Sequence, residues 1–188
     1  MPDEKRYYMA CLDLEGLSVL VVGGGRIALE KVAGLLDCGA DVTVVAPEIL
    51  PELRQRQVTW LARGYEPRDL AGRYLVVAAT QIEALNATVA RDAAQRSLLC
   101  NVVDDPDKCT VILPAIHRDG PIAIAVSTGG ASPALAKRLR DQFAAQIGPR
   151  TVAVARELRA RRPWAKRNLA TYDERKEYFE RLVDEALT

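Results

Sequence analysis

Two glycine-rich turns in this 188-residue chain have the residue types and spacing that bind anionic groups. The first is VVGGGRIA, in which three small residues stand in the spacing G-x-G-x-x-A. The first glycine allows a tight bend, the second lets a pyrophosphate approach the backbone, and the small third residue lets the following helix pack closely. The turn predicts a dinucleotide site; the alternative is a tight strand-to-helix turn that binds nothing. The expected nucleotide contacts here are Gly23, Gly24, Gly25, Arg26, Ile27 and Ala28.

The strand after this turn bears on the choice of nucleotide. DVTVVAP does not end in the Asp or Glu that usually binds a ribose 2′-hydroxyl, so Glu48 either takes that role or is a solvated loop acid. No arginine stands there to bind a 2′-phosphate, and the sequence therefore favours NAD over NADP. Ala46 and Pro47, with Thr80 after a later strand, complete the expected cofactor site, because ligands bind at the carboxyl ends of such strands.

The second turn is VSTGGASPALA, which a strand enters at Ser127. Ser132 is placed to cap a helix whose first residue is Pro133, where a missing N–H is harmless. We expect the turn to leave N–H groups and hydroxyls open to a second, anionic ligand. Cations on the following helix can bind the same ligand or form a solvated face. The expected contacts are Ser127, Thr128, Gly129, Gly130, Ser132, Lys137 and Arg138.

One carboxylate stands where it can act as a general base. NVVDDP places Asp104 at the end of an expected strand that faces the cofactor crevice. For Asp104, and more so for Asp105, the alternative is an Asx turn before Pro106. His117, the single histidine, is either a structural or solvated hairpin residue or, if the hairpin folds over the crevice, an acid–base or metal-binding group, and we count it among the expected substrate contacts. The sequence shows no His/Cys/Asp cluster of the kind that grips a transition metal.

Alternating apolar runs and helical patterns position these residues. The apolar runs do not alternate with polar residues, and helices separate them, which indicates a parallel, doubly wound, Rossmann-type sheet up to about residue 104. The expected strands are 18–22, 41–47, 58–62, 74–80 and 98–104, and the expected helices are 28–39, 82–97 and a short one from Pro51.

The pattern changes after residue 104. Residues 110–128 contain two strand-like runs joined by Arg118, Asp119 and Gly120, which predicts a β-hairpin, and the rest of the chain is helical. We therefore expect an NAD-binding domain over residues 1–105, a dimerisation and active-site region over 106–147, and a helical region over 148–188.

Composition excludes several classes of function. A net charge of +1 leaves no global field for nucleic acid or a membrane surface. No apolar run approaches the roughly 18 residues of a membrane span, and the first residues lack the apolar core of a secretory signal. Four cysteines without C-x-x-C spacing are typical of reduced thiols. We expect a cytoplasmic protein without nucleic-acid or membrane partners.

Together these motifs resemble the precorrin-2 dehydrogenase/sirohydrochlorin ferrochelatase family, the N-terminal part of siroheme synthases. The resemblance rests on LDLEGLSVLVVGGGRIALEKVAGLL, VVAAT, NVVDDP and TVILPAI, and most specifically on STGGASPALAKRLRD. The tail, RELRAR…ATYDERKEYFERL, extends it over essentially the whole chain. No methyltransferase module follows, so the chain resembles the stand-alone form.

The resemblance implies an activity. In that family NAD⁺ takes a hydride from precorrin-2 to give sirohydrochlorin, Asp104 matches the catalytic aspartate, and Ser127 and Thr128 match the turn lining the tetrapyrrole site. Some members also insert Fe²⁺ as a second substrate, and whether this chain does so stays open. Members are dimers, so we expect a homodimer, in line with a hairpin whose apolar face needs a cover. A non-catalytic NAD(H)-sensing module and a dehydrogenase of another polycarboxylate stay open as alternatives.

Overall fold

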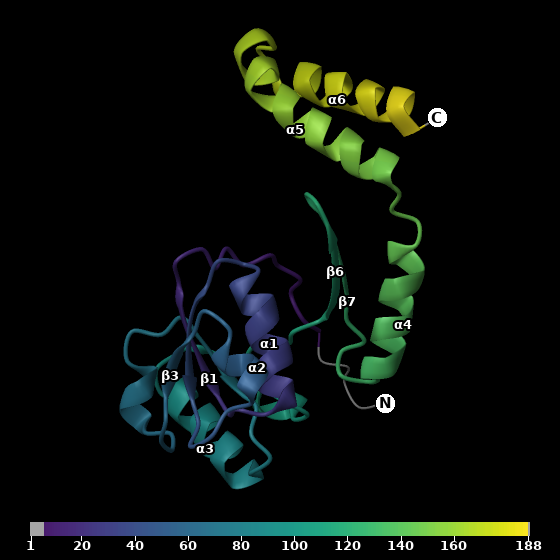
Figure 1. Ribbon diagram of the computed structural model, residues 1–188. Helices are drawn as coiled ribbons and strands as arrows, with labels where there is room; N and C mark the ends of the chain where they lie inside the picture. Colours follow the sequence, from purple (N-terminus) through teal and green to yellow (C-terminus); the bar gives the residue numbers. More distant parts are fainter. Residues whose placement is uncertain (1–5, 188) are drawn as a thin grey trace. The chain divides into compact units, whose positions relative to one another are not determined.

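The computed structural model describes residues 6–187 and divides into two compact units (Figure 1). The sheet unit comprises residues 8–113 and holds a parallel sheet. The hairpin unit comprises residues 114–187, with Arg6 and Tyr7, and holds a two-stranded sheet and the C-terminal helices. A Rossmann-type sheet followed by a β-hairpin and a helical end is thereby confirmed as the fold.

The strands of the sheet unit are parallel and lie in the order β3-β2-β1-β4-β5. Each expected strand is present, and each helix expected in this unit is present too. The strands are β1 (Ser18–Val22), β2 (Asp41–Val45), β3 (Thr59–Leu61), β4 (Leu75–Ala78) and β5 (Leu99–Val102). The helices are α1 (Arg26–Leu36), α2 (Pro51–Arg54) and α3 (Glu83–Ala94), with short 3₁₀ helices η1 (Pro67–Leu70) and η2 (Pro106–Lys108).

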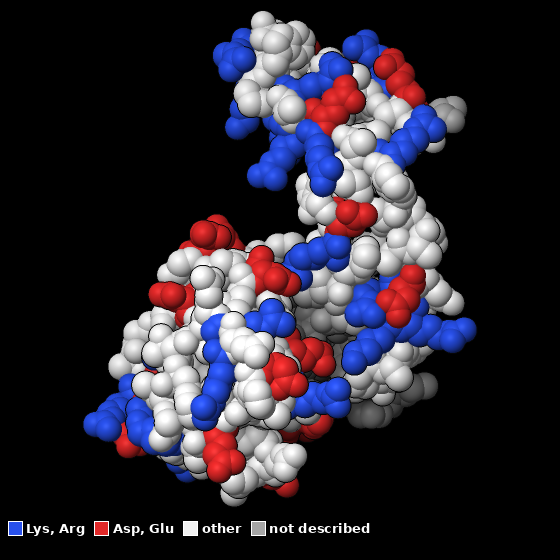
Figure 2. Space-filling view, in the orientation of Figure 1, with Lys and Arg blue, Asp and Glu red and all other residues white. Residues whose placement is uncertain are grey.

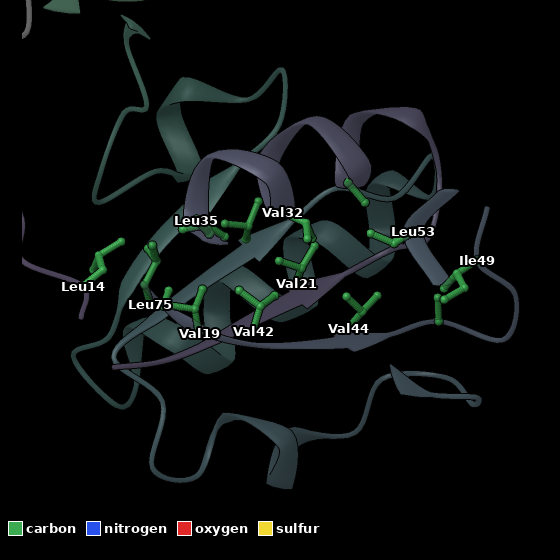
Figure 3. Packing of buried hydrophobic residues seen from close by; sticks show 14 residues of the cluster. Leu14, Val19, Val21, Val32, Leu35, Val42, Val44, Ile49, Leu53 and Leu75 are labelled. Carbon is green, nitrogen blue, oxygen red and sulfur yellow. The ribbon is translucent and has the colours of Figure 1, made fainter. Parts of the chain in front are cut away.

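Apolar side chains fill both faces of this sheet. Successive residues of a strand point to opposite faces, so Val19 and Val21 of β1 pack with Val32 of α1 on one face (Figure 3). Leu20 packs on the other face in a cluster that includes Val89 of α3. The absence of polar alternation along β1 therefore follows from its double burial.

The sheet unit extends beyond Pro106, where the sequence suggested a boundary, as far as Leu113. The segment after η2 returns to β5, because the N–H groups of Thr110 and Val111 donate to the Cys100 carbonyl at 2.9 and 3.1 Å. These bonds tie residues 106–113 to the sheet. A separate boundary near residue 148 stays a prediction.

The hairpin unit begins with the antiparallel strands β6 (Ala115–Asp119) and β7 (Ile122–Val126). Its turn differs from the expected one, because Arg118 and Asp119 pair within the ladder and the connection is Gly120 and Pro121. Gly120 has φ +55°, which a two-residue hairpin with glycine first requires.

Three helices complete this unit: α4 (Pro133–Ala144), α5 (Pro149–Asn168) and α6 (Tyr172–Leu187). The first of them packs on both strands of the hairpin, and the other two pack on each other. Within residues 6–187, no helix has both the length and the apolar character that crossing a membrane requires.

Candidate functional site

The register of the parallel sheet brings four strand ends into one row. Val22 of β1 pairs with Val45 of β2 and with Ala78 of β4. Ala78 in turn pairs with Val102 of β5. The segments that follow these residues hold the expected nucleotide site and Asp104, so they meet at one carboxyl edge. The strand order reverses between the parallel neighbours β1 and β4, because β2 and β3 are added on one side of β1 and β4 and β5 on the other, and open parallel sheets bind ligands at such a point.

The first glycine of the β1–α1 turn is required by the fold. Gly23 has φ +123°, and a Cβ there would lie 2.5 Å from the Ala79 carbonyl oxygen. Its N–H donates to the Val45 carbonyl at 3.0 Å. Gly24 is also confined, because a Cβ there would collide with the Glu48 carbonyl. Both positions therefore exclude side chains through contacts within the protein.

Gly25 differs, because the protein itself leaves its surroundings open. A Cβ at this position would meet nothing within 4 Å, and its backbone is extended. Gly25 is the N-cap of α1, no side chain caps it, and the first helical turn carries no acidic residue. Unpaired N–H groups and the helix dipole thus face open space, as a pyrophosphate site requires.

The side chains of the first turn of α1 fit the same interpretation. Ala28 is fully buried in the core, as the small third residue of the motif should be. Arg26 and Ile27 are exposed beside the turn, so the Arg26 guanidinium adds positive charge at the start of the helix. These three residues therefore lie at the start of α1 beside the turn, and their contact with a nucleotide stays a prediction.

The loop after β2 is held against the glycine turn. The Ala46 carbonyl accepts the Trp60 indole N–H at 3.0 Å, and the Leu50 N–H donates to the Gly24 carbonyl at 3.0 Å. Pro47 and Glu48 stay exposed at the same edge. An exposed carboxylate beside the turn is available to a ribose hydroxyl.

The β4–α3 turn is hydrogen-bonded to a residue of α3 that sequence reasoning missed. Asn86 of α3 is buried at 7% exposure and hydrogen-bonds to Thr80 through both ends of its amide. A signal was present, because Asn86 shares the buried helix face with Val89 and Ala93, where an apolar residue is expected.

The two acids after β5 differ in their surroundings. Asp104 is exposed and has φ +60°, a left-handed conformation that is uncommon outside glycine and that recurs at functional sites. Asp105 pairs with Lys108, and this hydrogen bond lowers the pKa of the Asp105 carboxyl and raises that of the Lys108 ammonium. Asp105 is thus engaged in the turn itself.

A buried thiol closes the turn that carries Asp104. The Val102 N–H donates to the Cys109 Sγ at 3.1 Å, and this sulfur lies 3.2 Å from the Val102 carbonyl and 3.3 Å from the Asp105 carbonyl. One sulfur therefore contacts the backbone on both sides of Asp104. From the sequence, Cys109 was only one of four cysteines expected to be reduced thiols.

The second glycine turn confirms one prediction and corrects another. Ser132 caps α4, accepting the Leu135 N–H at 3.2 Å. The Thr128 hydroxyl is not open as expected, because it bonds to the Ser132 carbonyl and N–H at 3.1 Å each. Ser127 accepts the Gly129 N–H at 3.2 Å, and a hydroxyl that accepts keeps its own proton to donate.

The other residues expected at this second ligand lie in the same unit. Gly129 and Gly130 have φ +62° and +93°, and both are exposed. Lys137 and Arg138 are exposed on α4, while His117 of β6 is half-buried opposite Ile124. On the face shown in Figure 2, Lys and Arg side chains gather over the C-terminal helices of the hairpin unit. Within residues 6–187, no three His, Cys, Asp or Glu side chains group as metal ligands would.

Known proteins share this arrangement. A family model described as putative NAD(P)-binding matches residues 10–115, more than half of the chain. A second, described as sirohaem biosynthesis protein central, matches residues 119–146, which include the second glycine turn. The chain belongs to this family of NAD(P)-binding proteins of sirohaem biosynthesis. The resemblance seen in the sequence is confirmed.

Members of the family include siroheme synthases. Siroheme synthase 3 of Aeromonas hydrophila subsp. hydrophila is 41% identical over 90% of this chain and 37% of its own length. Siroheme synthase of Actinobacillus pleuropneumoniae serotype 3 is 38% identical over 94% of this chain and 37% of its own length. The chain thus spans little more than a third of these curated relatives. A solved structure titled SirC, precorrin-2 dehydrogenase, matches with a TM-score of 0.80 and 28% identity, covering 97% of this chain and 93% of that chain.

Proposed function

We propose that this chain oxidises precorrin-2 to sirohydrochlorin with NAD⁺ as the hydride acceptor, in siroheme biosynthesis. The observation that carries the proposal is a match to SirC, precorrin-2 dehydrogenase, over 97% of the chain. The siroheme synthases among its relatives support the same substrate class. Two glycine turns, one suited to a nucleotide and one to further anionic groups, are consistent with such a reaction.

The carboxyl edge of the sheet fits a dinucleotide. Gly25 and the first N–H groups of α1 would hold the pyrophosphate, because the protein leaves that space open. Glu48, exposed beside Gly24, would accept the ribose 2′-hydroxyl and repel a 2′-phosphate, which favours NAD over NADP. The bound nucleotide supplies the hydride acceptor.

Asp104 is the proposed general base. Loss of a hydride from the tetrapyrrole is balanced by loss of protons from the macrocycle, and a carboxylate at the strand end can accept one. The Cys109 contacts on either side hold the turn that presents Asp104. Asp105 is less suited, because its carboxyl is engaged by Lys108.

The second glycine turn is the proposed site for substrate carboxylates. Ser127 retains a hydroxyl proton, and Lys137 and Arg138 supply exposed cations on the helix that Ser132 caps. Thr128 would shape the turn, since its hydroxyl is engaged internally. We also propose that the protein acts as a cytoplasmic homodimer.

The decisive experiment incubates the purified protein anaerobically with precorrin-2 and NAD⁺ and follows NADH and the tetrapyrrole spectrum. Formation of NADH with sirohydrochlorin supports the proposal. NAD binding without turnover favours an NAD(H) sensor, and turnover of another polycarboxylate alone favours a different dehydrogenase. Fe²⁺ added afterwards tests a second reaction, in which Fe²⁺ is a substrate and Asp104 again supplies a base.

The variant Asp104→Asn tests the base. Asparagine tolerates the left-handed backbone at this position, so the fold should persist while NADH formation is lost. Asp107→Asn is the matched control, because Asp107 is an exposed acid of the adjacent η2 with no assigned role. Equal turnover of both variants would remove Asp104 from the mechanism.

A further inference from the structure

The β4–α3 turn is held by a single buried amide. The Asn86 Oδ1 accepts the Thr80 hydroxyl at 2.7 Å and the Thr80 N–H at 3.3 Å, and the Asn86 Nδ2 donates to the Thr80 carbonyl at 2.9 Å. The amide orientation follows from this pattern, because only the oxygen accepts and only the nitrogen donates. Asn86 therefore joins the start of α3 to the backbone of the turn.

These contacts engage each polar group of Thr80. Its N–H and carbonyl bond to Asn86, and its hydroxyl donates to Asn86 while accepting the Ile82 N–H at 3.1 Å. A ligand that sought a hydrogen bond from Thr80 would compete with bonds already formed. The sequence suggested Thr80 as a direct cofactor contact, whereas its surroundings favour an indirect role.

The β4–α3 turn packs against the β1–α1 glycine turn, which begins the proposed nucleotide site. A Cβ on Gly23 would lie 2.5 Å from the Ala79 carbonyl oxygen and 3.2 Å from the Thr80 nitrogen. β1 and β4 are neighbours, and the Ala79 N–H donates to the Val22 carbonyl at 2.8 Å. A rotation of the 79–80 peptide would therefore change the shape of the space beside Gly23.

Helix stability and packing alone do not account for an asparagine at this place. Asparagine is a poor residue inside a helix, and burying its amide is unfavourable unless both ends are hydrogen-bonded. Leucine at the same position would extend the apolar face formed by Val89, Ala90 and Ala93. What asparagine provides at this position, and leucine would not, is the fixed conformation of the β4–α3 turn.

We propose that Asn86 is a positioning residue for the dinucleotide, and that Thr80 serves the site through Asn86 rather than by its own hydrogen bond to the ligand. This inference rests on the nucleotide site of the proposed function. It predicts that nucleotide affinity depends more on the Asn86 amide than on the Thr80 hydroxyl. The backbone bonds from Asn86 persist when the hydroxyl is removed.

The test measures NADH affinity by fluorescence titration, with folding checked by circular dichroism and thermal unfolding. Asn86→Leu should weaken NADH binding on the order of tenfold, about the effect of one hydrogen bond. Asn86→Asp, which keeps the acceptor and loses the donor to the Thr80 carbonyl, should weaken it by about threefold or more. Thr80→Val should change it by less than about threefold.

The matched control lies on the same helix. Asp92 is buried at 5% exposure and accepts the Tyr65 hydroxyl at 3.1 Å, six residues beyond Asn86. Asp92→Leu should lower the unfolding temperature and leave NADH affinity unchanged. If Asn86→Leu does not fold, Asn86→Asp decides between the same outcomes.

Two results overturn the inference while leaving the proposed function in place. One is that the Asn86 variants, like Asp92→Leu, lower the unfolding temperature but bind NADH as tightly as the wild-type protein does, which would make Asn86 structural only. The other is that Thr80→Val weakens binding more than Asn86→Leu does, which would make Thr80 a direct ligand contact. Absence of NADH binding by the wild-type protein would overturn the proposed nucleotide site and this inference together.

Discussion

Substitutions of Gly23 and Gly25 in the first glycine turn should impair different properties, stability for Gly23 and nucleotide binding for Gly25. Gly23→Ala places a methyl group 2.5 Å from the Ala79 carbonyl at φ +123°, so both sterics and backbone conformation oppose it. Strain from this sparsely populated backbone conformation, about 1–3 kcal/mol, and overpacking, about 1–3 kcal/mol, add to roughly 2–6 kcal/mol. That is a large part of the roughly 5–15 kcal/mol that stabilises a typical domain.

Gly25→Val should leave folding nearly intact and impair the nucleotide. The backbone there is extended and open space surrounds it, so the expected loss of stability is below about 1 kcal/mol, the cost of a poorer N-cap residue. NADH affinity should fall by tenfold or more, because a side chain would occupy the path of the pyrophosphate to the helix N-terminus, an interaction worth up to about 2 kcal/mol.

The assays are urea unfolding and NADH titration on the same preparations. Gly34→Ala on α1 is the control, because a Cβ there meets nothing within 4 Å and the residue is helical. It should raise stability by about 0.5–1 kcal/mol without changing NADH affinity. If Gly25→Val binds NADH as tightly as the wild-type protein, the nucleotide lies elsewhere. If Gly23→Ala is as stable as the wild-type protein, the close approach of the Ala79 carbonyl to Gly23 is refuted.

Further predictions concern stability and thiol reactivity. Asp69 is buried and hydrogen-bonded to Arg63, and this bond lowers the pKa of the Asp69 carboxyl. The ionised carboxyl therefore stabilises the fold above the ordinary Asp pKa of about 4, and this stabilisation is lost as the pH falls from there through the lowered pKa. Asp69→Asn should therefore lose about 1–2 kcal/mol at neutral pH and show a weaker acid dependence in urea unfolding. Ser132→Ala should lower the free energy of unfolding by about 1 kcal/mol, because it removes the hydroxyl that caps α4. An unchanged free energy of unfolding would show that this cap contributes no stability. Burial raises the pKa of the Cys100 thiol to about 11, so a thiol reagent at neutral pH should modify exposed Cys11 and spare Cys100 until urea is added.

Local chemistry made much of the molecule predictable from the sequence. The strands and helices follow from apolar periodicity, and the Ser132 cap follows from residues three positions apart. The glycine turn was recognisable because its spacing encodes backbone freedom and helix packing within a few residues. These features need no knowledge of distant parts of the chain.

Contacts between distant segments decided the rest. The periodicity of α3 places Asn86 on its buried face, but only the packed structure shows that its amide is hydrogen-bonded to Thr80, whose own polar groups are thereby engaged. Residues 106–113 belong to the sheet unit because the Cys100 carbonyl accepts the N–H groups of Thr110 and Val111, which no local pattern encodes. The Thr128 hydroxyl is engaged by a local contact instead, because its partner Ser132 lies four residues ahead at the start of α4, and sequence reasoning did not foresee this bond.

The sequence by itself therefore determined the fold class, the family and the two glycine turns, because each depends on residue types at short, fixed spacings. Only the tertiary structure decided which of the expected residues face open space and which are used to build the site. Gly23 and Gly25 illustrate the difference. The motif spacing predicts a tight bend at Gly23 and a close approach of pyrophosphate at Gly25, and the structure adds that the Ala79 carbonyl closes the space at Gly23 while the space at Gly25 stays open. Strand register sets such distances, and it is a property of the packed sheet as a whole.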